Sequence, residues 1–220
     1  MHQVRILDIA ELTHDVRRYR LERPEGYDFL AGQATEIAID QEGWREERRP
    51  FTFTGLAGDP YLEFTIKSYR DHEGVTNRLG TMQVGETLLV DDAWETIPYR
   101  GPGTFVAGGA GITPFLALLR WLAAEGKLDG HRLIFSNSME KDIILREELE
   151  GLAGLDRLFT VTREKVDGLL NERLDAEFLK RHVPDVTGLF YLCGPDRMTE
   201  GVKEALVAQG ADPEKVLIAG

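Results

Sequence analysis

The stretch TFVAGGAGITPF, residues 104–115, has the residue types and spacing of a phosphate-binding turn. Gly109 and Gly111 can take a positive φ and let a ligand approach the backbone. Thr113 is predicted as a helix N-cap and Pro114 as the first helical residue. The N–H groups and positive dipole end of such a helix favour a pyrophosphate. A tight turn with an ordinary cap would give the same pattern, so this motif alone leaves both interpretations open.

The stretch LFYLCGPDRM, residues 189–198, has a similar organisation. It reads as a buried strand that ends in Cys193 and Gly194 and is followed by a helix. Ligands gather at the carboxyl ends of strands in open parallel sheets, so Cys193 is expected on the same edge as Gly109. A lone cysteine is usually a small buried hydrophobic residue. Two glycine-bearing strand ends in one crevice favour a functional position here.

The strands and helices that must hold these turns lie in two regions of the chain with different sequence patterns. Up to about Trp94 the chain has short, β-rich, partly alternating segments separated by turn signals. They are residues 2–12, 16–22, 34–40, 50–55, 61–69 and 86–90, with one short helix at 74–82. Short strands at this spacing predict a small antiparallel β-barrel.

The sequence pattern changes after the predicted linker IPYRGPG, residues 97–103. Apolar strands are expected at 104–109, 131–137, 158–163, 188–194 and 215–220, and helices at 113–126, 144–152, 174–182 and 196–210. Strand–helix alternation predicts an α/β domain with a parallel sheet covered on both faces. The expected fold is therefore an antiparallel barrel, residues 1–98, followed by an α/β domain, residues 99–220.

The composition of the chain excludes several classes of partner and site. The 220 residues are 42% hydrophobic and 29% charged, with a net charge of −12, which argues against nucleic-acid or anionic-membrane partners. No apolar run reaches the roughly 18 residues of a membrane span, and no secretory signal is seen. The single cysteine excludes an internal disulfide and a four-thiolate iron–sulfur cluster. The five histidines have no metal-ligand spacing, so no metal site is predicted. A cytoplasmic location is expected.

Four motifs in order, RPFT, GVT, GGAGITP and CGPDRM, resemble those of the ferredoxin–NADP reductase superfamily, and within it the small flavodoxin reductases. The resemblance covers nearly the whole chain, and four motifs in order are specific where each alone is weak. It implies a flavin-binding antiparallel barrel followed by an NAD(P)-binding α/β domain, in agreement with the two sequence patterns described above.

The resemblance implies roles for the strand motif Arg49-Pro50-Phe51-Thr52, which stands where the family has Arg-x-Tyr-Ser. Arg49 would pair with the flavin phosphate, because a guanidinium fork suits this oxyanion. Phe51 would pack on the isoalloxazine ring, and Thr52 would act catalytically by hydrogen-bonding the flavin N5. Phenylalanine in place of tyrosine removes a hydroxyl, so somewhat weaker flavin binding is expected. Without the other motifs, the segment would read as a plain strand with an inward aromatic.

A second flavin element is expected in residues 67–80. By resemblance, the cofactor-binding residues there are Lys67, Gly74, Val75 and Thr76. Thr76, at a short helix start, could offer its hydroxyl and N–H to a pyrophosphate. Tyr69 or His72 could cover an adenine ring, which favours FAD over FMN, although FMN would use the same Arg49 and Thr52.

The resemblance assigns the α/β domain to NADH or NADPH. The residues expected to bind it are Gly109, Gly111, Thr113, Cys193, Gly194 and Pro195. Cys193 and Gly194 would border the nicotinamide, which makes Cys193 the second catalytic candidate. Asn137, Ser138 and Lys141 occupy the region of the 2′ site. One lysine is no phosphate clamp, so NADH is slightly favoured.

The implied activity is hydride transfer from NAD(P)H to FAD, followed by single-electron transfer to an external acceptor such as flavodoxin, ferredoxin, a haem protein or a ferric chelate. An acidic ferredoxin would need a basic patch, for which Arg45, Arg48 and Arg78 are candidates. The chain ends without the terminal aromatic of many relatives, so another group, Trp94 among them, is expected to cover the flavin or leave it open. The alternatives are a non-catalytic subunit of a redox assembly and a reductase of free flavin.

Overall fold

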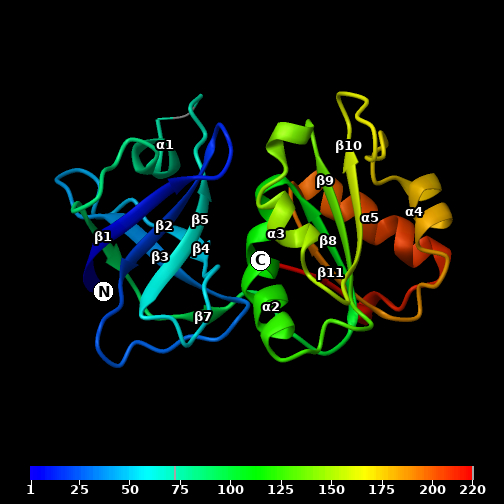
Figure 1. Ribbon diagram of the computed structural model, residues 1–220, viewed down its shortest axis with the longest axis horizontal. Helices are drawn as coiled ribbons and strands as arrows, with labels where there is room; N and C mark the ends of the chain where they lie inside the picture. The colour runs from blue at the N-terminus through cyan, green and yellow to red at the C-terminus, as the bar shows by residue number, and fades with distance from the viewer. Residues whose placement is uncertain (72, 220) are drawn as a thin grey trace. The chain divides into compact units, whose positions relative to one another are not determined.

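The computed structural model describes residues 1–71 and 73–219, and these residues form two compact units (Figure 1). The first unit comprises Met1–Pro98 and Thr113–Trp121, and the second comprises Tyr99–Ile112 and Leu122–Gly220. Helix α2 (Thr113–Ala124) therefore contributes its N-terminal part to the first unit.

The first unit is built on an antiparallel sheet in the order β4-β3-β6-β1-β2-β5, with β7 paired to β3. Its strands are β1 (His2–Glu11), β2 (Val16–Glu22), β3 (Gln33–Ile39), β4 (Arg49–Thr52), β5 (Tyr61–Lys67), β6 (Thr87–Val90) and β7 (Trp94–Glu95). A bridge between Phe53 and Phe64 brings the end of β4 to β5, so the sheet nearly closes on itself. The predicted antiparallel barrel is confirmed.

Alternation along the strands builds the core of this barrel. On β5, Leu62, Phe64 and Ile66 are buried in the apolar core, whereas Glu63 and Thr65 point to the other face of the sheet. The short helix α1 (Val75–Leu79) adds the buried side chains of its first and last residues to the same core. Burial of such side chains stabilises the fold by about 1.5–3 kcal/mol each.

The second unit contains a five-stranded parallel sheet in the order β10-β9-β8-β11-β12. Its strands are β8 (Gly103–Gly108), β9 (Arg132–Asn137), β10 (Asp156–Val161), β11 (Leu189–Cys193) and β12 (Val216–Ile218). Helices α4 (Ala176–His182) and α5 (Asp196–Gln209) pack on one face, and α3 (Arg146–Glu150) lies on the other side of the sheet in Figure 1. The predicted α/β architecture is confirmed.

No helix in residues 1–71 and 73–219 is long and apolar enough to cross a membrane. In the same ranges, no group of three or more His, Cys, Asp or Glu side chains could hold a metal ion.

Candidate functional site

The glycine turn of the second unit follows the strand β8 directly. Residues Gly109–Ile112 form a 3₁₀ turn, η1, and α2 begins at Thr113. The sequence predicted Thr113 as the cap before the helix, whereas the structure makes it the first helical residue. The reason is that the turn before it is already helical, which leaves no extended residue to act as a cap.

The two predicted glycines of this turn have different roles. Gly109 has a φ of 54°, and a Cβ added to it would meet nothing within 4 Å, so this backbone faces open space. Gly111 is packed closely, because a Cβ there would lie 2.2 Å from the carbonyl oxygen of Cys193. Gly111 therefore lets the turn approach the end of β11, while Gly109 offers the backbone surface that a ligand could reach.

The ends of β8 and β11 are brought together as the sequence predicted. The two strands are parallel neighbours, and Ala107 is paired with Cys193. Gly194 has a φ of 156°, and a Cβ there would lie 3.1 Å from the backbone of Gly108. Pro195 is exposed and occupies the N-cap position of α5. The loop after β11 therefore packs against the glycine turn at one edge of the sheet.

Cys193 is a partly buried free thiol at this edge. Burial raises its pKa to about 11, against a smaller opposing effect of a hydrogen bond with the backbone of Gly194. The thiol is therefore protonated at neutral pH. It offers a neutral, polarisable contact and is not an activated nucleophile.

The strand motif of the first unit, β4, lies at one end of the strand order and pairs with β3 along its length. Arg49 is half-exposed, with Nη1 donating to the carbonyl oxygen of Arg48 at 2.6 Å and Nη2 lying 3.3 Å from Glu47. Its guanidinium is accessible to an anion that can compete with this exposed carboxylate.

The other residues of the β4 motif divide between two faces. Pro50 is exposed, and Thr52 is partly exposed and paired with Ala34 of β3. Phe51 packs against the apolar core of the barrel. Part of its ring is therefore used in the core, as expected for a strand with an inward aromatic, and its remaining surface is what a flavin could contact.

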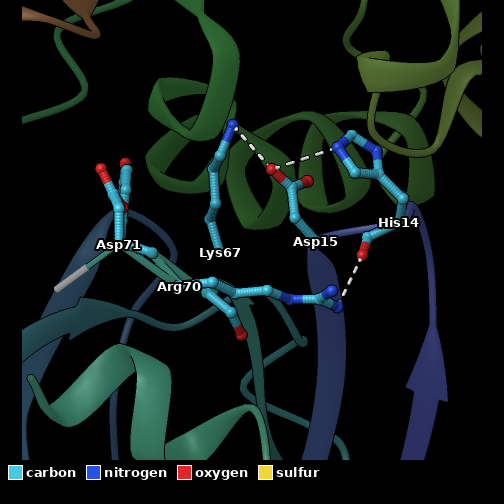
Figure 2. Close-up of a pocket in the computed structure, with 7 residues that line it drawn as sticks. His14, Asp15, Lys67, Arg70 and Asp71 are labelled. Atoms are coloured by element: carbon cyan, nitrogen blue, oxygen red, sulfur yellow. Dashed lines mark hydrogen bonds and ion pairs between the residues drawn. The ribbon is translucent and has the colours of Figure 1, made fainter. Parts of the chain in front are cut away.

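A pocket of about 300 Å³ lies beside the second predicted flavin element (Figure 2). It is lined by His14, Asp15, Lys67, Ser68, Tyr69, Arg70 and Asp71. Figure 2 shows Lys67 and His14 directed at the carboxylate of Asp15, at 3.1 and 3.6 Å. Burial raises the pKa of Asp15, but hydrogen bonds from Lys67 and Thr13 outweigh it and hold the pKa below its usual value. The pocket is thus lined by charges of both signs.

This pocket extends the prediction made from sequence. Lys67 and Tyr69 were singled out, and Lys67 Nζ lies 5.9 Å from the centre of the Tyr69 ring. His14 and Asp15 were missed, because they come from the β1–β2 connection and only the fold brings them to β5. The other adenine candidate, His72, lies outside the described residues.

The Gly74-Val75-Thr76 segment forms the start of α1. Gly74 is the N-cap, with an extended backbone, and no side chain caps the helix. Val75 is buried in the barrel core, so its side chain serves packing. Thr76 is partly exposed in the first turn, where N–H groups have no intrahelical acceptor.

The region of the 2′ site follows β9. Asn137 is buried, and neither polar atom of its side chain has a hydrogen-bond partner among the described residues. The carbonyl oxygen of Ser138 accepts from the backbone N–H of Arg163 at 2.9 Å, which places this exposed arginine beside the region. Lys141 lies in the 3₁₀ turn Glu140–Asp142. Arg163 was missed by the sequence analysis, because it follows β10 and not β9.

The three arginines considered for a basic patch each have an acidic neighbour. Arg45 lies 2.6 Å from Asp40, and Arg48 lies 3.6 Å from Asp91. Arg78 lies 3.9 Å from Glu86 and donates to Gln41 at 2.7 Å. These contacts offset much of the positive charge that the patch would present.

An antiparallel barrel joined to a parallel sheet, with a glycine turn after the first parallel strand, defines the two-domain class of ferredoxin–NADP reductase-like proteins. A family model described as "Oxidoreductase NAD-binding domain" matches residues 105–204. An NADH-cytochrome b5 reductase 1 of Aspergillus terreus is 32% identical over 91% of this chain and 75% of its own length. The chain therefore belongs to the ferredoxin–NADP reductase superfamily that includes the cytochrome b5 reductases, and it is an oxidoreductase.

Two further comparisons agree with this assignment. The ferredoxin–NAD(P)(+) reductase component of a naphthalene 1,2-dioxygenase/salicylate 5-hydroxylase system from Ralstonia sp. is 27% identical over 93% of this chain and 64% of its own length. The flavohem-like FAD/NAD-binding domain of nitric oxide dioxygenase from Vibrio cholerae O1 biovar El Tor has the same fold, with a TM-score of 0.88. That structure is 21% identical, and the match covers 98% of this chain and 96% of that one.

Proposed function

We propose that this protein passes a hydride from NAD(P)H to bound FAD and then delivers single electrons to an external acceptor. The observation that carries the proposal is the convergence of Gly109, Gly111 and Cys193 at one sheet edge, within the residues matched by the NAD-binding family model. When bound, FAD would supply the redox chemistry that converts a two-electron donor into a one-electron source.

Residues 99–220 bind the dinucleotide in this proposal. The open backbone at Gly109 and the N-terminus of α2 receive the pyrophosphate, because N–H groups and a helix dipole favour an anion. The neutral thiol of Cys193 and the adjoining Gly194 border the nicotinamide. Since the thiol is protonated, it contributes contact without adding a charge next to the transferred hydride.

Residues 1–98 bind FAD in this proposal. Arg49 pairs with the flavin phosphate, and Thr52 donates its hydroxyl hydrogen bond to the flavin N5. The pocket of about 300 Å³ lined by Lys67 and Tyr69 is proposed to receive the adenosine part of the cofactor, which supports FAD over FMN. The structural neighbour from Vibrio cholerae is named as an FAD/NAD-binding domain, which agrees with this choice.

We propose NADH as the preferred donor. Lys141 is the cation singled out in the predicted 2′ region, and acidic residues Glu140 and Asp142 flank it. The relative from Aspergillus terreus is named as an NADH enzyme. The exposed Arg163 beside Ser138 is the residue that could reverse this preference by pairing with a 2′-phosphate.

The donor preference is measured as the ratio of kcat/KM for NADH to that for NADPH, with ferricyanide as the acceptor. The proposal predicts a ratio above one. If Arg163 clamps a 2′-phosphate instead, the ratio will lie below one, and Arg163→Ala will raise KM for NADPH while leaving KM for NADH unchanged.

The proposed acceptor is external to this chain and takes one electron at a time. The relatives are named for cytochrome b5 and for a ferredoxin, so both kinds of protein are candidates. With a net charge of −12 and acidic neighbours at Arg45, Arg48 and Arg78, an acidic ferredoxin or flavodoxin would be repelled over most of the surface. Rates with flavodoxin, ferredoxin and a haem protein, compared at low and high salt, identify the acceptor class.

The proposal is tested with purified protein loaded with FAD and mixed with NADH under anaerobic conditions. Bleaching of the flavin bands, followed by recovery on addition of ferricyanide, is the expected result. Flavin that stays bound through gel filtration distinguishes this activity from reduction of free flavin. Flavin that stays bound but is not reduced by either donor would indicate a non-catalytic subunit.

A further inference from the structure

The barrel carries a buried carboxylate on its outer face that the proposed chemistry does not use. Glu63 lies on β5 between Leu62 and Phe64, which face the apolar core, so its own side chain points away from that core. The side chain is nevertheless only 4% exposed. A carboxylate taken out of water is costly unless it is paired and hydrogen-bonded. The burial of Glu63 therefore depends on its ion-pair and hydrogen-bond partners.

The principal partner of Glu63 comes from helix α2. Arg120 Nη1 lies 2.7 Å from Oε1 of Glu63 and also donates to the carbonyl oxygen of Thr54 at 2.6 Å. Arg20 Nε lies 3.0 Å from Oε2 on the opposite side of the carboxylate. All of these residues belong to the first compact unit.

The positions of these residues connect the two motifs that the proposed reaction needs. Arg120 lies seven residues after Thr113, two turns along α2, on nearly the same face of the helix. Thr54 lies two residues beyond Thr52, the predicted flavin contact. One guanidinium therefore ties the N-terminal part of α2 to the backbone that continues from β4.

We propose that Arg120 and Glu63 are positioning residues for hydride transfer. They fix the start of α2, where the pyrophosphate is proposed to bind, relative to Thr52 at the flavin. This inference rests on the proposed function. Neither side chain needs to touch a cofactor. Nη1 of Arg120 makes the connection, because it donates to a carboxylate oxygen and to a backbone carbonyl together.

The expected effect is kinetic. A displacement on the order of 1 Å between reacting groups can lower a rate by about 100-fold. Loss of the two Arg120 contacts is therefore expected to slow flavin reduction more than it affects flavin retention. A role limited to stability would instead lower the melting temperature and leave the reduction rate per bound flavin unchanged.

The experiment uses the full chain loaded with FAD and single-turnover reduction by NADH, followed at the flavin absorbance band. Arg120→Ala should reduce FAD at a rate at least about tenfold below that of the wild type, with unchanged flavin stoichiometry. Arg120→Lys keeps the charge, but its shorter side chain does not place an ammonium where Nη1 lies between Glu63 and the Thr54 carbonyl, so it should recover only part of the rate. If Arg120→Ala does not fold, Arg120→Lys and Glu63→Gln carry the test.

Arg23→Ala is the matched control. Arg23 is 18% exposed, close to the 20% of Arg120, and its guanidinium also holds backbone carbonyls, those of Ala57 and Asp59. Its replacement should lower the melting temperature while the reduction rate stays within about twofold of the wild type. The double variant Arg120→Ala/Glu63→Gln should be no slower than Arg120→Ala, because both changes break one connection.

Two outcomes overturn the inference. One is a reduction rate in the foldable Arg120 and Glu63 variants within about twofold of the wild type. The other is an equal loss of rate in Arg23→Ala. If the wild type itself is not reduced by NADH or NADPH, the proposed function fails, and that result is distinct from either of these.

Discussion

At the scale of single residues, Arg49 carries the prediction of flavin binding. Its guanidinium is half-exposed and contacts only an exposed carboxylate and a neighbouring carbonyl among its described partners. A charge-assisted contact with phosphate is worth about 1.5–3 kcal/mol, so Arg49→Ala should weaken FAD binding by about 10- to 100-fold. Isothermal titration of the apoprotein with FAD measures this change.

Arg45→Ala provides the control for that measurement. Arg45 is similarly exposed and is paired with Asp40 at 2.6 Å, but it lies before the β4 motif. Its replacement should leave the FAD affinity unchanged. Equal affinities of the Arg49 and Arg45 variants would remove Arg49 from the flavin site.

Cys193 leads to a prediction about how thiol alkylation and stability depend on pH. Since burial raises the pKa of its thiol from 9.0 to about 11, the folded protein binds this proton more tightly than the unfolded chain. Alkylation by iodoacetamide should be slow at pH 7 and should accelerate as the pH rises towards 11. The contribution of this group to stability is constant below pH 9 and is lost as the pH rises through the folded-state pKa.

The unfolded chain in denaturant is the reference for Cys193, since its thiol titrates near the ordinary value. Alkylation of the folded protein at pH 7 as fast as that of the unfolded chain would contradict a protonated, partly buried thiol. It would also remove the argument that Cys193 offers the nicotinamide a neutral contact.

At the scale of elements, the glycine turn η1 and helix α5 give a matched pair of substitutions. Gly111→Ala places a Cβ 2.2 Å from a backbone oxygen of Cys193, so the turn must move away from β11. Overpacking of this kind costs about 1–3 kcal/mol, which lowers the melting temperature by about 2–10 °C. KM for the nicotinamide donor should rise as well, because the displaced turn is the proposed pyrophosphate site.

Gly201 in α5 is the control for Gly111. A Cβ at Gly201 meets nothing within 4 Å, and the residue is exposed in the middle of a helix. Gly201→Ala should therefore stabilise the protein by about 0.4–1 kcal/mol and leave KM unchanged. Differential scanning calorimetry and steady-state kinetics measure both variants. A Gly111→Ala protein with wild-type stability and KM would show that the close approach is not required.

Elements with a clear period could be predicted from sequence. The apolar runs of β8 to β12 and the alternation of β5 are local signals, because burial of one or both faces decides which residue types occur. The two-residue strand β7 was missed, since a strand so short has no period of its own and depends on its pairing with β3. Thr113 was predicted as a cap but is the first helical residue of α2, because the 3₁₀ turn before it has no distinctive composition.

At the scale of the whole molecule, the ordered motifs were enough to identify the superfamily and the two-part architecture, but not the contacts between distant segments. The pairing of Glu63 with Arg120 spans 57 residues, and neither residue belongs to a motif. The pocket around Asp15 and Lys67 likewise depends on how β1, β2 and β5 are arranged. Such contacts follow from tertiary structure, which local propensity does not encode.

The central claim is that one chain holds a flavin and reduces it with a nicotinamide dinucleotide. It is tested most directly by the visible spectrum of the FAD-loaded protein, recorded anaerobically before and after NADH is added. We predict loss of the flavin absorbance bands within the mixing time or shortly after it, and their return with ferricyanide. A yellow protein whose spectrum stays unchanged with both NADH and NADPH would contradict the account.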